Sequence, residues 1–213
     1  MNPIDEPAAV GTGLAQIPHN IVATVLDLAV AGWAAVLSAG LVSQQSSEAD
    51  IAGFLGTEMR AAQDRRPELR GRMRIEEEVG TRSPGAAKAN GRIDVKVIYS
   101  LTYGEYFGLE CKRVGAKGLA RKYLTEGVLR FVSAKYSHGH DFGAMLAFDV
   151  SRRHGAGLRY VRDYLAKHGD AACVVQPWIA ETSFSVASDL YRTRHQQVGG
   201  TLITLLHLFL SVR

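Results

Sequence analysis

Two strand-like segments that lie a short loop apart constrain the fold of this chain more than any other feature. In residues 93–99, and again in residues 106–113, apolar side chains alternate with polar ones. Alternation with a period of two is typical of strands that bury one face. Gly104, in the loop between them, suits the left-handed position of a three-residue hairpin turn centred on Thr102. The pattern therefore predicts an antiparallel hairpin.

The register of this hairpin follows from burial, because a slip by one residue would turn the apolar side chains toward solvent. One register brings the apolar faces together, with the pairs Val97–Phe107, Val95–Leu109 and Ile93–Cys111. The same register places Asp94 directly opposite Glu110 on the other face, with Lys112 two residues further along. The expected polar face therefore holds two neighbouring carboxylates and an ammonium group.

Two neighbouring carboxylates repel each other and destabilise a sheet unless a cation lies between them. Oxygen ligands suit Mg²⁺ or Mn²⁺, and the backbone carbonyl of Cys111 would add a ligand beside Asp94 and Glu110. Such a metal activates a bound water and neutralises charge on a phosphate. Lys112 would orient that water or stabilise the transition state. The alternative is an exposed hairpin face whose charged side chains are simply solvated.

A third carboxylate is expected from a helix that precedes the hairpin. Ser47 and Asp50 have the spacing of a capping box, which marks the start of this helix. Its apolar stripe is formed by Ile51, Phe54, Leu55, Met59 and Ala62. Glu58 falls on this stripe, where a carboxylate is costly unless it meets a cation, so we expect Glu58 to complete the site. Glu77, in a predicted strand at 73–79, is a rival, and the alternative for Glu58 is a rim residue paired with an arginine.

The remaining sequence alternates between helical and strand-like segments. The predicted order is a helix at 119–136, a strand at 144–150, a helix at 158–167 and strands at 173–179, 189–195 and 201–212. His207, inside the last apolar strand, is interpreted as a hydrogen-bonded core histidine rather than a ligand. The fold class is therefore α/β, with a helical N-terminal extension at 1–47 and one domain at 48–213.

The apolar run Ile21–Val42 is long enough to suggest a membrane span. It contains Asp27, however, and a central carboxylate costs roughly 2.5–3.5 kcal/mol in a membrane. Because the run is also rich in alanine, we expect a buried helix or helical hairpin, with a membrane anchor as the alternative. The two cysteines, Cys111 and Cys173, make no disulfide framework and predict reduced thiols in a cytoplasmic protein.

A mild basic bias permits a polyanionic partner, since the formal net charge is +4 and the isoelectric point about 9.1. Basic residues gather after the hairpin and again at 60–74. The first group supplies the candidate phosphate contacts Arg113, Lys117, Arg121, Lys122 and Lys135. Contacts of this kind give affinity without sequence information. The alternative is two solvated basic faces.

The hairpin resembles the core of the PD-(D/E)XK nuclease superfamily, which includes restriction endonucleases and anti-phage defence nucleases. The resemblance is carried by Gly91-Arg92-Ile93-Asp94-Val95-Lys96-Val97 and by Gly108-Leu109-Glu110-Cys111-Lys112-Arg113. It implies a restriction-endonuclease-like fold, in which a helix, a three-stranded antiparallel meander, a second helix and a fourth strand follow one another over 48–150. It also implies that Asp94 and Glu110 bind metal, that Lys112 assists the water and that Glu58 completes the site. Ile93 stands where the motif has proline.

The expected function is Mg²⁺-dependent hydrolysis of nucleic acid, with double-stranded DNA as the preferred substrate and defence or restriction as the setting. The alternative is a non-catalytic nucleic-acid-binding or assembly subunit that retains the fold. The chain contains no recognisable base-reading module. We therefore expect selectivity to come from self-association or a partner subunit, with the N-terminal helices and the strand at 201–212 as contact surfaces.

Overall fold

The computed structural model describes residues 16–81, 91–100, 105–137, 139–153, 155–186 and 189–212. In chain order its elements are α1 (His19–Ser38), α2 (Glu48–Asp64), η1 (Pro67–Leu69), β1 (Arg74–Thr81), β2 (Gly91–Ser100), β3 (Glu105–Val114), α3 (Lys117–Tyr123), η2 (Leu124–Val128), α4 (Leu129–Val132), β4 (Phe142–Asp149), α5 (Ala156–Lys167), β5 (Val174–Ala180), β6 (Leu190–Gln196) and β7 (Leu202–Ser211). The expected α/β class is confirmed. The turn expected around Thr102 and Gly104 lies outside the described residues.

The described strands form one mixed sheet in the order β1-β2-β3-β4-β7-β6-β5. The strands β3, β4 and β7 run parallel at its centre, and antiparallel strands flank them on both sides. Parallel strands need cover on both faces, and β4 and β7 are accordingly buried over most of their length. The carboxyl ends of β3 and β4 therefore meet at one edge of the sheet.

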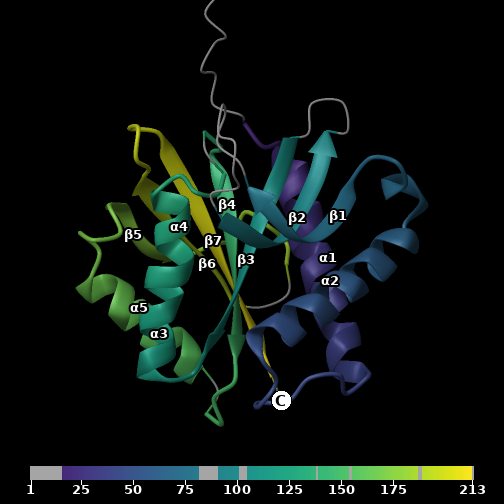
Figure 1. Ribbon diagram of the computed structural model, residues 1–213, viewed down its shortest axis with the longest axis horizontal. Coiled ribbons are helices and arrows are strands. Elements are labelled where there is room, and N and C mark those ends of the chain that lie inside the picture. The colour runs from purple at the N-terminus through teal and green to yellow at the C-terminus, as the bar shows by residue number, and fades with distance from the viewer. Residues whose placement is uncertain are drawn as a thin grey trace, which may run out of the picture.

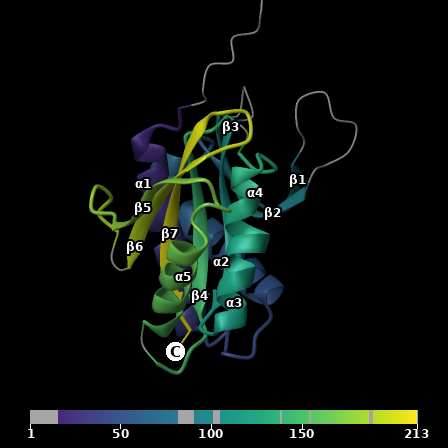
Figure 2. The same ribbon diagram turned by 90° about the vertical axis from the view of Figure 1, so that its left-hand side faces the viewer.

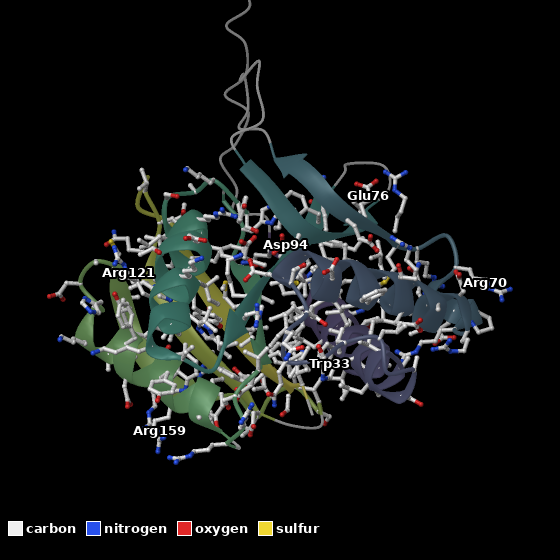
Figure 3. All side chains as sticks on the ribbon, turned by 60° about the horizontal axis from the view of Figure 1, so that its bottom comes forward. Trp33, Arg70, Glu76, Asp94, Arg121 and Arg159 are labelled. Atoms are coloured by element: carbon white, nitrogen blue, oxygen red, sulfur yellow. The ribbon has the colours of Figure 1, made fainter. Side chains whose placement is uncertain are left out.

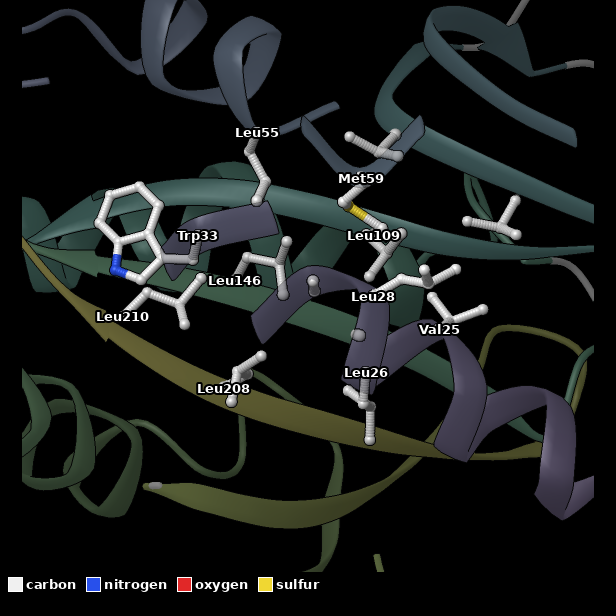
Figure 4. Packing of buried hydrophobic residues seen from close by; sticks show 14 of the residues in the cluster. Val25, Leu26, Leu28, Trp33, Leu55, Met59, Leu109, Leu146, Leu208 and Leu210 are labelled. Atoms are coloured by element: carbon white, nitrogen blue, oxygen red, sulfur yellow. The ribbon is translucent and has the colours of Figure 1, made fainter. Parts of the chain in front are cut away.

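Helices cover both faces of this sheet, as Figures 1 and 2 show. The helices α1 and α2 pack on one face, and α3, η2, α4 and α5 pack on the other. In the first layer, leucines from the central strands meet apolar side chains of both helices (Figure 4). The strands provide Leu109, Leu146 and Leu208, and the helices provide Val25, Leu28, Leu55 and Met59. Full burial of each such side chain contributes about 1.5–3 kcal/mol.

Helix α1 belongs to this core. It is long and apolar enough to cross a membrane by length and composition alone, yet it buries Val25, Leu28 and Trp33 inside the domain. The indole Nε1 of Trp33 donates a hydrogen bond to the Ser211 carbonyl at 3.2 Å. The buried helix expected for this run is therefore observed, and the extension at 1–47 and the domain at 48–213 share one hydrophobic cluster.

The predicted β-strands and the helix at 158–167 agree with the structure to within about two residues at their ends. The single helix expected at 119–136 is wrong in two respects. A π-helical turn, η2, interrupts it, and it ends at Val132, because Ala134 adopts a left-handed conformation with φ 56°. Phe54 was also misplaced: it is 38% exposed rather than part of the buried stripe of α2.

The strand expected at 201–212 is not a contact surface. β7 pairs with β4 on one side and β6 on the other, so it lies inside the sheet. Helix α1 likewise turns its apolar side into the domain. The apolar side chains of α1 and β7 are therefore explained by the core, and the expectation of β7 as a contact surface was wrong, while self-association or a partner subunit remains a prediction.

His207 is a hydrogen-bonded core histidine, as expected. The carbonyl of Ala172 accepts from Nδ1 of His195, which leaves Nε2 of that ring to accept from Thr193. The Thr193 oxygen then accepts from Nε2 of His207, whose Nδ1 accepts from the Tyr123 hydroxyl at 2.8 Å. Both rings are neutral in this arrangement, and burial lowers the pKa of each. Every polar atom in this buried row has a partner.

Candidate active site

The site begins where β2 and β3 separate. Their pairing follows the predicted register at Val97–Phe107 and Val95–Leu109, and the described ladder ends there. Beyond it, the Asp94 carboxylate accepts the backbone N–H of Cys111 at 2.7 Å, taking the place of a strand partner. The expected pairing of Ile93 with Cys111 is wrong, since Ile93 packs in the opposite core layer. Figure 3 shows Asp94 at this point, beside α2.

The Lys112 ammonium lies at the centre of the site. It is 2.8 Å from Glu110 Oε1, 2.8 Å from Glu48 Oε1 and 4.0 Å from Asp94 Oδ2. It also donates to the Cys111 carbonyl at 2.9 Å. The structure therefore brings Asp94, Glu110 and Lys112 together as expected, but the predicted pairing of Asp94 directly opposite Glu110 is not part of the described ladder.

Burial makes these charges costly. It raises the pKa of Glu110 to about 7, with the nearby Asp94 charge as a further cause, while Lys112 and Arg130 oppose the rise. Burial also raises the pKa of Asp94. Burial alone would lower the pKa of Lys112, but Glu110, Glu48 and Asp94 together raise it. Lys112 therefore stays protonated at neutral pH and acts as a donor and a fixed positive charge, not as a proton acceptor.

The π-helical turn η2 brings the second helical layer close to Lys112. A Cβ on Gly127 would collide with the end of Met145 and lie 3.5 Å from Lys112 Cγ. A glycine here therefore lets η2 approach the sheet without displacing the end of Met145. One turn further, Arg130 Nη1 contacts Glu110 Oε1 at 2.9 Å and Tyr136 at 2.7 Å. Turns of π-helix are frequent at functional sites.

A cavity of about 170 Å³ opens beside Asp94, and Glu48 and Glu77 also line it. Glu77 forms an ion pair with Arg60 at 2.8 Å. Glu58 does not line this cavity. The reason is position along the helix: Glu58 is ten residues after Glu48, or about 15 Å at 1.5 Å per residue.

The third carboxylate of the site is therefore Glu48 and not the expected Glu58. Glu48 Oε2 also accepts the backbone N–H of Arg113 at 3.1 Å, which ties the start of α2 to β3. The sequence contained a signal for Glu48, because it directly follows the N-cap Ser47. A carboxylate in the first turn is, however, equally explained by the helix dipole. Arg130 was recognised only as one basic residue among several.

The donors suit a hard divalent cation. With every group ionised, Glu48, Asp94 and Glu110 carry three negative charges against the two positive charges of Lys112 and Arg130. Glu110 Oε2 is buried and has no hydrogen-bond partner in the part of the chain that the structure describes. An unpartnered carboxylate oxygen in a negatively charged site fits Mg²⁺ or Mn²⁺, which prefer oxygen ligands.

The carboxylates do not form a closed metal cage. Among the described residues, no group of three or more His, Cys, Asp or Glu side chains lies close enough together to hold an ion. The Lys112 ammonium, which contacts both Glu48 and Glu110, explains this spacing because it lies between them. Metal binding by Asp94, Glu110 and the Cys111 carbonyl therefore remains a prediction.

The candidate phosphate contacts differ in their surroundings. Lys117, Arg121 and Lys122 are exposed on α3, and Lys135 is exposed after α4. Arg113 instead donates to the Gln44 carbonyl at 2.8 Å, so it holds the loop before α2 in place. The other four candidates are exposed on the surface, whereas Arg113 is a positioning residue.

Comparison with known proteins adds no relative to this description. The chemistry of the site is therefore inferred from its own donors, charges and burial. No protein-family model, no curated protein and no solved structure matches this chain.

Proposed function

We propose that this chain is a metal-dependent nuclease of the PD-(D/E)XK type, with Asp94, Glu110 and Lys112 at the cleavage site. The observation that carries the proposal is the buried Lys112 ammonium between Glu48 and Glu110, beside a Glu110 oxygen for which the described residues provide no hydrogen-bond partner. A buried ionised cluster of this kind costs stability. Such clusters are typical of catalytic sites, where charge is arranged to meet a substrate.

The order of elements supports the same proposal. Helix α2 precedes the antiparallel strands β1, β2 and β3, and a helical segment then leads to β4. This is the order that the resemblance implies for a restriction-endonuclease-like core. In addition, Asp94 stands where the ladder ends, so its carboxylate both accepts the Cys111 N–H of β3 and lines a cavity.

Each site residue has a role that follows from its contacts. Asp94 and Glu110 present carboxylate oxygens, and Arg130 holds Glu110 from the other side. A divalent ion bound there would lower the pKa of a water and neutralise charge on the scissile phosphate. Lys112, held protonated by its carboxylate neighbours, donates to the attacking water or to the phosphate oxygens. The preferred substrate is double-stranded DNA.

Incubation of the purified chain with plasmid, linear duplex and single-stranded DNA, and with RNA, tests this proposal. We expect cleavage with Mg²⁺ or Mn²⁺ and none with EDTA. Asp94→Asn, Glu110→Gln and Lys112→Met should each reduce the cleavage rate by at least about 10²-fold. Glu105→Gln, an exposed carboxylate on the same strand, is the matched control and should cleave normally.

Two outcomes would contradict the proposal. Wild-type cleavage rates in the Glu110→Gln variant would remove Glu110 from the mechanism. Nucleic-acid binding without cleavage under any divalent ion would favour the alternative, a non-catalytic binding or assembly subunit. We also propose a cytoplasmic location, which fractionation of the native host would test.

A further inference from the structure

A second polar cavity lies at the edge of the sheet where β3 and β4 end. It has a volume of about 500 Å³, within the range of ligand-binding sites. Three arginines line it, and its lining contains no aspartate or glutamate. We call it the arginine pocket and define it by Arg152, Arg153, Arg159 and Tyr160.

The arginines of this pocket are exposed, and Figure 3 shows Arg159 projecting outward from α5. The ion pairs found among the described residues include none of the three. Asp149, the nearest carboxylate in sequence, is buried and accepts the backbone N–H groups of Ser151 and Gly157. Three positive charges thus converge on one cavity without a neutralising side chain, which favours an anionic ligand.

The wall of the pocket is firmly built. Gly115 ends β3 with φ 126°, and a Cβ there would lie 2.7 Å from the backbone nitrogen of Ser151. The β3 and β4 ends are therefore in direct backbone contact, and Val150 N–H also donates to the Val114 carbonyl at 3.0 Å. The backbone of this wall is therefore held in place before a ligand binds.

The arginine pocket shares two chain segments with the candidate active site. Gly115 is three residues beyond Lys112 on β3, which is roughly 10 Å along the strand. Gln44 and Gln45 line the pocket immediately before the helix start that carries Glu48. Successive phosphates of one strand rise by about 3.4 Å along a duplex, so the pocket lies within a few nucleotides of the active site.

We propose that the arginine pocket binds a phosphate group of the nucleic-acid strand that is cleaved at Lys112. This inference rests on the proposed function and extends it to the path of the substrate. Arginine matches the geometry of phosphate oxygens through its planar fork of donors. Tyr160, which is 38% exposed, offers a ring against which an adjoining base can stack.

Binding without turnover tests the proposal. In EDTA, the affinity of the full chain for a labelled DNA duplex is measured by fluorescence anisotropy over a series of salt concentrations. For the triple variant R152Q/R153Q/R159Q we expect weaker binding. We also expect the slope of log affinity against log salt to become shallower by at least about 0.9, the value for one phosphate contact.

The matched control is R162Q/K167Q/R194Q, which removes the same charge from exposed side chains outside the pocket and outside both basic groups. An equal loss in both triples would show a net-charge effect and would overturn the proposal. Unchanged binding in the first triple, with normal unfolding temperatures, would also overturn it. A larger loss in the first triple supports it.

Further binding measurements distinguish the possible sources of the phosphate, and distinguish failure of the pocket proposal from failure of the proposed nuclease function. Duplexes with and without a 5′-phosphate distinguish an internal phosphate from a terminal one, and either supports the proposal. If inorganic phosphate stabilises the wild type but not the triple, while both bind DNA equally, the pocket takes free phosphate and the proposal fails. Arginine-dependent binding without cleavage by the wild type in Mg²⁺ would support the pocket and overturn the nuclease function.

Discussion

Replacing Glu110 by glutamine should stabilise the metal-free protein at alkaline pH. Glu110 is fully buried, and burial together with Asp94 raises its pKa from 4.5 to about 7. The folded state therefore binds this proton more tightly than the unfolded chain, so the contribution of Glu110 to stability is largest below pH 4.5 and is lost as the pH rises through 7. At about 1.36 kcal/mol per pH unit, the ionised carboxylate destabilises the folded state by about 3 kcal/mol above pH 7.

Glutamine resembles the protonated carboxyl group, because its carbonyl can still accept from Lys112 and Arg130. In EDTA at pH 8 we expect Glu110→Gln to raise the free energy of unfolding by up to about 3 kcal/mol. For a chain of this size that corresponds to an unfolding temperature higher by roughly 6–12 °C. At pH 4.5 the two proteins should unfold at nearly the same temperature. Glu105→Gln serves as the exposed control on the same strand.

Urea unfolding followed by circular dichroism at several pH values measures this difference. A variant that is no more stable than the wild type at pH 8, or a difference that does not change with pH, would refute the reasoning. Adding Mg²⁺ provides a second readout, because a ligand that binds only the folded state stabilises it. Mg²⁺ should stabilise the wild type at pH 8 more than the glutamine variant.

Three further changes test the packing around the site. Thr193→Val removes the hydroxyl that links the two buried histidines. The free energy of unfolding, measured in urea, should fall by about 1–3 kcal/mol for each ring nitrogen that loses its partner. An unchanged free energy would mean that the rings find other partners. Burial lowers the pKa values of both histidines. The stabilisation that the two neutral rings give the wild type should therefore be lost as the pH falls below 6.5. The unfolding midpoint in urea, measured over a series of acid pH values, tests this. Gly127→Ala should push η2 away from Met145, at a cost of about 1–3 kcal/mol, and reduce cleavage more than stability; a fully active variant would contradict the close approach. Ser47→Ala removes the cap of α2 and should cost about 1 kcal/mol in urea unfolding; an unchanged stability would mean that the cap contributes nothing.

The hairpin and the start of α2 could be predicted from the sequence because each depends on residues that are close together in the chain. The hairpin register needed only alternation and burial, and Val95–Leu109 and Val97–Phe107 pair as expected. The capping box at Ser47 and Asp50 likewise fixed the start of α2. The same reasoning placed Glu110 and Lys112 on one face of β3, because the two residues are two apart in a strand, and predicted that Asp94 lies near them.

The errors came from features that periodicity does not encode. A helical period predicts which side chains share a face but not which end of the helix meets the site. The apolar stripe of α2 therefore predicted Glu58 as the third carboxylate, whereas the structure has Glu48 at the site. Strand parity assumes a continuous ladder, and it failed for Ile93 because the described pairing of β2 with β3 ends at Val95. The central place of β7 depends on pairing with β4 and β6, which no local pattern shows.

The packing of α1 against the end of β7 has a consequence for synthesis on the ribosome. Trp33 and Ser211, which bond to each other, are 178 residues apart in sequence. At 5–20 residues per second, roughly 10–35 seconds pass between the synthesis of these two residues. During that interval α1 cannot complete its burial, and a helix apolar enough to cross a membrane is open to chaperones, to membranes and to other nascent chains. The helix that stabilises the finished domain is therefore its main hazard during translation.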